Sequence, residues 1–303
     1  MAMRVATFGI SEQMIAAALR TQSTMANAQI QEASGVVSSD FGGYGSSTQQ
    51  ILNLQVSVTR SQSYIDAATQ ADSKIQVMYS TVNSVADLIT QFRSLLTSAT
   101  NAASTDSTSV TQSAQDMLQQ MASLLNTQYD GGYLFGGART GQAPVDISSS
   151  TYAAATSPSS ADTSYYQGDH ELASVRVSDS RTVSYGVAAD NTAFEEALRA
   201  LNLVANNSSL STSTLNEALD LATNAVDAVG VVQNRISNAS SSIEKASAYQ
   251  TEYQSFANTL GSDLTSVDVA AVTAQLSTYQ AQLTASYAAI AKVQSLNLAS
   301  YLH

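Results

Sequence analysis

The side chains best able to do chemistry stand together at Asp169, His170 and Glu171, a trio of acid–base groups or metal ligands. Neighbouring residues on an extended segment point to opposite faces, so these three side chains do not converge. The other histidine of the sequence, His303, is its last residue, and no third ligand is identifiable. The pattern favours a solvated turn, and we predict no metal, no cofactor and no catalytic residue.

A glycine-rich run from Gly131 to Gly137 is the second candidate for chemistry. Gly131 and Gly136 have the separation of a phosphate-binding loop, but position 137 holds glycine where that loop needs lysine. Turn glycines after Asp130 explain the run and predict a tight hairpin. Serine is abundant, but nothing resembles a Gly-x-Ser-x-Gly elbow with its acid and base partners. We therefore predict that the chain is not an enzyme.

Four long stretches repeat apolar residues three and four positions apart, two before the glycine-rich middle and two after it. This spacing predicts amphipathic helices with coiled-coil seams. A short Ser/Thr/Asn/Asp-rich break at 97–109 makes the helices on either side antiparallel neighbours. The strongest stripe comprises Ala71, Ile75, Met78, Val82, Val85, Ile89, Phe92 and Leu96, and a comparable one runs from Leu215 to Leu264.

The middle of the chain, residues 131–190, changes to alternating apolar residues and turn signals. Residues 172–177 and 183–187 alternate as strands do, whereas 146–164 are rich in Ser, Thr and Ala and predict a loop. The predicted fold is mainly α, a long antiparallel helical rod or coiled-coil bundle made from both chain ends, with a small antiparallel β insertion in the middle. We expect about four strands in that insertion.

The two outermost stretches are almost free of charge. From Leu264 to Leu302 the charged side chains are Asp268 and Lys292 alone, although a solvated helix normally carries a charged face. Small polar and apolar side chains tolerate close packing on several sides, so we predict burial against other copies. The alternative, a mobile Ala/Ser/Gln-rich tail, fits the sustained apolar stripe less well.

These patterns predict five parts along the chain. They are an assembly helix at 1–40 that pairs with another at 265–303, rod helices at 41–130 and 191–264, and the β-rich outer insert at 131–190. Residues predicted to contact other subunits are Ile15, Leu19, Leu276, Leu283, Ile290 and Val293.

Composition and charge narrow the function further. With 303 residues, 7% aromatic side chains, no Trp and two Pro, the chain suits a thin bundle better than one large globular core. A formal charge of −12 and scattered Lys and Arg argue against nucleic-acid binding. No apolar stretch is long enough for membrane insertion, and no cleavable secretory signal is present. An exported protein of this kind needs a dedicated route.

Several segments carry a resemblance to a known family. Residues 82–106 are similar to a rod helix and its Ser/Thr/Asn turn, and 128–144 to an aromatic turn before Thr and Pro. Tyr166-Gln-Gly-Asp169 precedes a strand, and 283–302 resembles a closing helix. In this order the segments resemble the bacterial flagellins, and most closely their hook–filament junction members, the type 3 hook-associated proteins. Residues 34–43 replace the Arg-rich stretch of filament flagellins, which favours the junction type or an atypical flagellin.

The resemblance implies a structural subunit of the bacterial flagellum that polymerises through its terminal helices at the hook–filament junction. It implies export without a cleavable signal peptide to an extracellular position, other flagellar subunits as partners, and an export chaperone. A flagellin of the filament bulk is the alternative within the family. A coiled-coil adhesin or scaffold is the alternative outside it, and would be stably folded at both ends.

Overall fold

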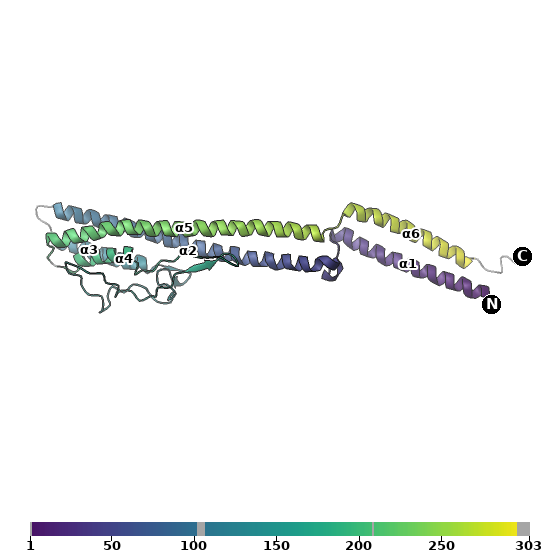
Figure 1. Ribbon diagram of the computed structural model, residues 1–303, viewed down its shortest axis with the longest axis horizontal. Helices are drawn as coiled ribbons and strands as arrows, with labels where there is room; N and C mark the ends of the chain where they lie inside the picture. Colours follow the sequence, from purple (N-terminus) through teal and green to yellow (C-terminus); the bar gives the residue numbers. More distant parts are fainter. Residues whose placement is uncertain (1, 102–106, 208, 296–303) are drawn as a thin grey trace. The chain divides into compact units, whose positions relative to one another are not determined.

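A computed structural model describes residues 2–101, 107–207 and 209–295, with side chains from residue 9 onward. The described residues form six α-helices, one 3₁₀ segment and four short strands (Figure 1). The helices are α1 (Ala2–Ser34), α2 (Thr48–Asn101), α3 (Ser107–Leu125), α4 (Thr192–Ala205), α5 (Thr212–Thr265) and α6 (Val269–Ser295), and the 3₁₀ segment is η1 (Phe41–Ser47). The predicted class, mainly α with a small antiparallel β insertion, is confirmed.

Contacts divide the chain into two compact units. The first unit lies within 1–59 and 254–303, and the second comprises 60–253. Each unit is therefore built from segments far apart in the sequence, and α2 and α5 contribute to both. The five-part division made from the sequence stays a prediction.

In the second unit, α2 and α5 lie side by side and antiparallel (Figure 1). Rising residue numbers on α2 meet falling numbers on α5. Three side-chain hydrogen bonds record this order, joining Ser61 to Gln250, Asp72 to Ser240, and Asn83 to Gln233. The α2 stripe predicted from Ala71 to Leu96 lies in the core, and none of its residues is more than 3% exposed. Seam spacing thus correctly identified the face of α2 that is buried.

Helix α4 is the most buried element of the second unit. It packs against α3, and most of its side chains are inaccessible, including Phe194 and Leu198. The sequence analysis did not single out α4, although Ala193, Ala197, Leu201 and Val204 follow the spacing of an amphipathic helix. Two polar side chains on it hold the predicted loop: Glu195 accepts from the backbone N–H of Asp162, and Asn202 donates to the carbonyl of Ala153.

The four strands form two separate antiparallel hairpins. Strand β1 (Gln128–Tyr129) pairs with β2 (Gly132–Tyr133), and β3 (Ser174–Arg176) pairs with β4 (Thr182–Ser184). Between β1 and β2, Asp130 and Gly131 have φ values of 50° and 74°. Both lie in the left-handed region that a tight two-residue hairpin turn requires, which explains the Asp-Gly pair. The hairpin and strand predictions are confirmed.

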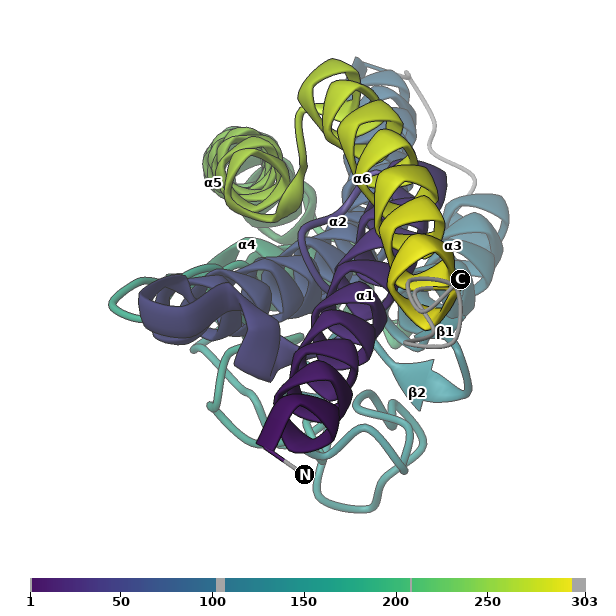
Figure 2. The ribbon, with the colours of Figure 1, turned by 90° about the vertical axis from the view of Figure 1, so that its right-hand side faces the viewer.

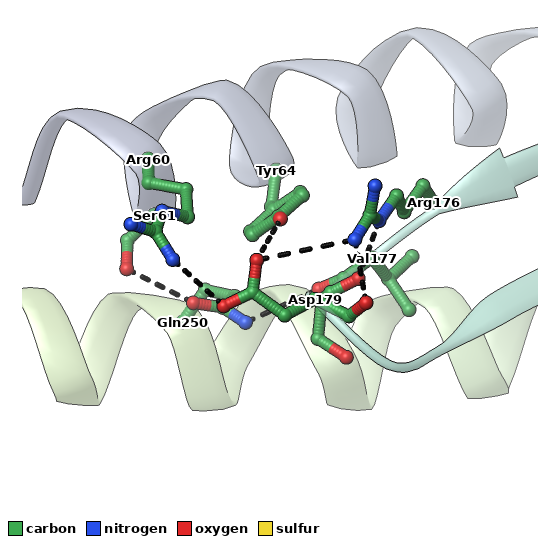
Figure 3. Close-up of polar contacts among 8 residues, drawn as sticks. Arg60, Ser61, Tyr64, Arg176, Val177, Asp179 and Gln250 are labelled. Atoms are coloured by element: carbon green, nitrogen blue, oxygen red, sulfur yellow. Dashed lines mark hydrogen bonds and ion pairs between the residues drawn. The ribbon is translucent and has the colours of Figure 1, made fainter. Parts of the chain in front are cut away.

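The tip of the β3–β4 hairpin is fastened to α2 and α5 by polar side chains (Figure 3). Asp179 accepts hydrogen bonds from the Arg60 guanidinium at 2.9 Å and from the Tyr64 hydroxyl at 2.8 Å, both on α2. Gln250 of α5 donates to the carbonyl of Val177 at 3.2 Å. Because Gln250 is only 7% exposed and accepts from Ser61 as well, its amide is enclosed between the two helices and the hairpin.

Replacement of Asp179 should loosen this hairpin and remove part of its acid sensitivity. The hydrogen bonds from Tyr64 and Arg60 lower the pKa of Asp179. A lowered folded-state pKa contributes stability that is present above the unfolded pKa of about 3.9 and is lost as the pH falls through the folded value. In Asp179→Asn we expect lower amide protection of residues 172–187 at pH 7 and a smaller loss on acidification. Hydrogen exchange, corrected for intrinsic rates, measures both.

Asp227→Asn is the matched control, because it removes an exposed carboxylate of α5 in the same unit. It should leave protection of residues 172–187 unchanged. Equal protection in the two variants would contradict the role given to Asp179.

Candidate assembly surface

The first unit pairs the two ends of the described chain. Helices α1 and α6 lie antiparallel and side by side (Figures 1 and 2). A backbone bridge between Val36 and Ser266 fixes their register, since Val37 N–H donates to the Thr265 carbonyl at 2.8 Å and Val267 N–H to the Gly35 carbonyl at 3.0 Å. Because this bridge lies directly beyond α1 and before α6, it determines which turns of the two helices meet.

Helix α6 turns its predicted stripe toward α1. Leu276 and Leu283 are 5% and 7% exposed, and Leu276 packs in a cluster with Ala28 of α1. Ile290 and Val293 are half-buried farther along the same heptad-spaced face. Leu276 therefore lies in a seam within the chain, with the other three on the same face of α6, and contact of these four residues with another subunit stays a prediction.

The other two predicted contact residues, Ile15 and Leu19, remain outside that seam. Their exposed fractions are 40% and 59%, whereas Ala18 between them is 4% exposed. Since a helix turns by about 100° per residue, burial of Ala18 directs Leu19 to the flank of α1. Ile15 and Leu19 are one turn apart and adjacent on that flank. Their contact with another subunit stays a prediction.

The exposed surface of the α1–α6 pair has more apolar and fewer charged side chains than is usual for a solvated helix pair. Large apolar side chains on it include Ile30 at 57% and Tyr287 at 53% exposed. Exposed threonines of α6, such as Thr278 and Thr284, donate their hydroxyls to carbonyls one turn earlier in the same helix. Their polar groups are thus already satisfied, and packing against a neighbour costs little desolvation. Such a surface is typical of an assembly interface.

Asp169, His170 and Glu171, the residues considered above for acid–base or metal chemistry, instead hold neighbouring loops together. The Asp169 carboxylate accepts from the backbone N–H groups of Ala138 at 2.8 Å and Glu171 at 3.0 Å, and these bonds lower its pKa. His170 is 83% exposed and contacts Asp190 at 2.8 Å. Across the described residues, no group of three or more His, Cys, Asp or Glu is arranged to hold a metal ion. These contacts fasten backbone segments to one another.

Glycine residues leave the space that these loop contacts need. Gly137 has a φ of 69°, and a Cβ there would overlap the Asp169 carboxyl group. A Cβ on Gly168 would overlap the carbonyl of Gly136. Close approach between loops therefore accounts for glycine at these positions.

Comparisons with known proteins agree with this architecture. Residues 5–140 match the bacterial flagellin N-terminal helical region. A protein described as a flagellar hook-associated protein of Vibrio parahaemolyticus has a similar fold, with a TM-score of 0.62 and 16% identity over 72% of this chain and 97% of that chain. Flagellar hook associated protein-3 of Legionella pneumophila is similar with a TM-score of 0.53 and 13% identity, over 71% of this chain and 97% of that chain. No curated protein matches this sequence. In the described parts of the chain, no helix is both long and apolar enough to cross a bilayer.

Proposed function

We propose that this chain, whose residues 5–140 match the bacterial flagellin N-terminal helical region, is a structural, non-enzymatic subunit of the bacterial flagellum at the hook–filament junction. The family match is the observation that carries the proposal. The apolar, weakly charged surface of the α1–α6 pair supports the proposal, because a subunit that is buried among other copies needs no charged helix face. The resemblance of several segments to junction proteins supports the finer assignment.

Assembly through the terminal helices has a direct energetic basis. Unassembled, the first unit exposes Ile15, Leu19, Ile30 and Tyr287 to water. Burial of each such side chain by a neighbouring subunit contributes about 1.5–3 kcal/mol at most, which offsets the entropy lost when the helices become fixed in a lattice. The mechanism therefore has terminal helices that are mobile before assembly and ordered after it.

A place in the flagellum also implies partners and a route of export. The partners are other flagellar subunits, because the α1–α6 surface offers them apolar side chains. It lacks the clustered cations that nucleic acid binds. The chain leaves the cell by the flagellar export route, and an export chaperone holds the terminal helices before that step. The final location is extracellular.

Filament flagellin is the second candidate, because the matching family model is named for flagellin. The fold favours the junction role, since both solved structures compared above are of hook-associated proteins. The two candidates differ in copy number and in place along the flagellum, and this difference makes them separable.

Labelling of intact flagella tests the proposal. Gold-labelled antibody raised against residues 131–190 should mark one narrow zone at the hook–filament boundary. Label along the whole filament would instead establish filament flagellin, and unlabelled flagella in cells that make the protein would overturn both. Purified protein provides the second measurement: we expect no long filaments from this chain alone after addition of salt or seeds, whereas filament flagellin would form them.

A further inference from the structure

A groove of about 420 Å³ lies within the first unit, between the beginning of α2 and the end of α5. Its size is in the range of pockets that receive a ligand or several side chains. Gly261 lies in its lining, and a Cβ built there would meet nothing within 4 Å. The lining residues are Ile51, Leu54, Gln55, Val58, Thr59, Ala257, Asn258, Gly261, Ser262 and Thr265.

The flank of α1 that carries Ile15 and Leu19 projects outward and so has a shape complementary to this groove. Ile15 and Leu19, one turn apart, make an apolar ridge that the described chain covers only in part. Since the ridge is exposed, it does not fill the groove of its own chain. Ridges of side chains that enter grooves are the usual form of helix packing.

The charges beside these two surfaces are also complementary. Between residues 13 and 31 the sequence has one charged side chain, Arg20, directly after Leu19. Residues 48–59 have none, and 254–265 have one, Asp263, directly after the lining residue Ser262. Arg60, directly after the lining residue Thr59, is already paired with Asp179. Arg20 and Asp263 are both exposed, and neither takes part in an ion pair among the described residues. The ridge thus has an unpaired cation beside it, and the groove has an unpaired anion beside it.

We propose that the groove between α2 and α5 receives the Ile15–Leu19 ridge of a second copy of this chain, with Arg20 of one copy beside Asp263 of the other. The contact joins two different surfaces, so each pair keeps a free ridge and a free groove, and further copies add until a ring closes. It rests on the proposed function, which brings copies together in the flagellum. It also identifies the surface that Ile15 and Leu19 contact.

Engineered thiols test the contact directly, because the sequence contains no cysteine. Full-length Leu19→Cys and Gly261→Cys proteins are co-expressed, and isolated flagella are treated with a short bis-maleimide. We expect a crosslinked dimer from this mixture. Leu19→Cys mixed with Val231→Cys is the control, because Val231 is 68% exposed on α5 away from the groove. Equal yields from the two mixtures, or no dimer from the first, would overturn the proposal.

Reversal of charge tests the same contact independently. In the thiol-labelled background, Arg20→Glu or Asp263→Arg alone should lower dimer yield by about tenfold, because like charges then meet. Arg20→Glu in one copy with Asp263→Arg in the other should restore most of the yield. Failure of the pair to restore it, while each single change lowers it, would overturn the pairing of these two residues.

Purified full-length protein at high concentration separates this inference from the proposed function. Specific crosslinking in solution, together with unlabelled flagella, would reject the flagellar role and retain the contact. Labelled junctions without specific crosslinking would retain the role and reject the contact.

Discussion

Deletion of residues 266–303 is expected to abolish incorporation of the chain into flagella while leaving residues 60–253 helical. The deletion removes α6 and with it Leu276 and Leu283, so the inner face of α1 around Ala28 loses its partner. The second unit keeps its own core, which is built from other segments. Thermal unfolding by circular dichroism should retain the transition of the second unit. Motility of cells that carry only the truncated protein should be lost.

Point variants separate the seam from any effect of the deletion on export. Leu276→Gln with Leu283→Gln places amides in the α1–α6 seam, whereas Ser277→Gln with Thr284→Gln places the same amides on exposed positions next to them. Only the first pair should prevent incorporation into flagella, because a buried amide without a partner is costly. Secretion into the medium is measured for both. A truncated protein that still assembled would contradict the mechanism, as would equal incorporation of the two double variants.

Phe194→Ala should destabilise the second unit by about 3–5 kcal/mol, the range for loss of a buried aromatic ring. Phe194 is fully buried on α4, and its ring lies edge-on to that of Phe135, with centroids 5.9 Å apart and planes at 82°. The pair joins the most buried helix to the segment after the first hairpin. Removal of one ring leaves a cavity and also loses the edge-to-face contact. Urea unfolding of the full-length chain measures the change.

Tyr249→Ala provides the comparison for Phe194→Ala. Tyr249 is 65% exposed on α5 in the same unit, and alanine suits a helix. Its replacement should change the free energy of unfolding by no more than about 0.5 kcal/mol. Similar losses in the two variants would mean that the ring of Phe194 is not a core contact.

Local patterns in the sequence were sufficient to predict the elements whose structure depends on near neighbours. The stripe from Ala71 to Leu96 identified the buried face of α2, because a seam at that spacing can face only one side of a helix. Asp130 and Gly131 predicted a tight hairpin, because the turn requires their backbone conformation. The absence of charge near the chain end predicted burial against other copies, which stays a prediction.

Other features depended on contacts between distant segments. Burial of the polar residues Glu195 and Asn202 of α4 depends on the loop that both side chains bind, so no local pattern indicated it. The hydrogen bonds of Asp179 with Arg60 and Tyr64 join residues more than a hundred positions apart, so no local pattern indicated them.

The assembly surface itself combines both kinds of information. The sequence by itself determined that the terminal helices are apolar and nearly uncharged, since that depends on composition and spacing alone. Which of their faces remain free was decided by tertiary structure. The bridge between Val36 and Ser266 sets the register of α1 on α6, so Leu276 and Leu283 are buried within the chain while Ile15 and Leu19 stay exposed. An apolar residue on α1 has no preferred side until a partner helix and its register are fixed.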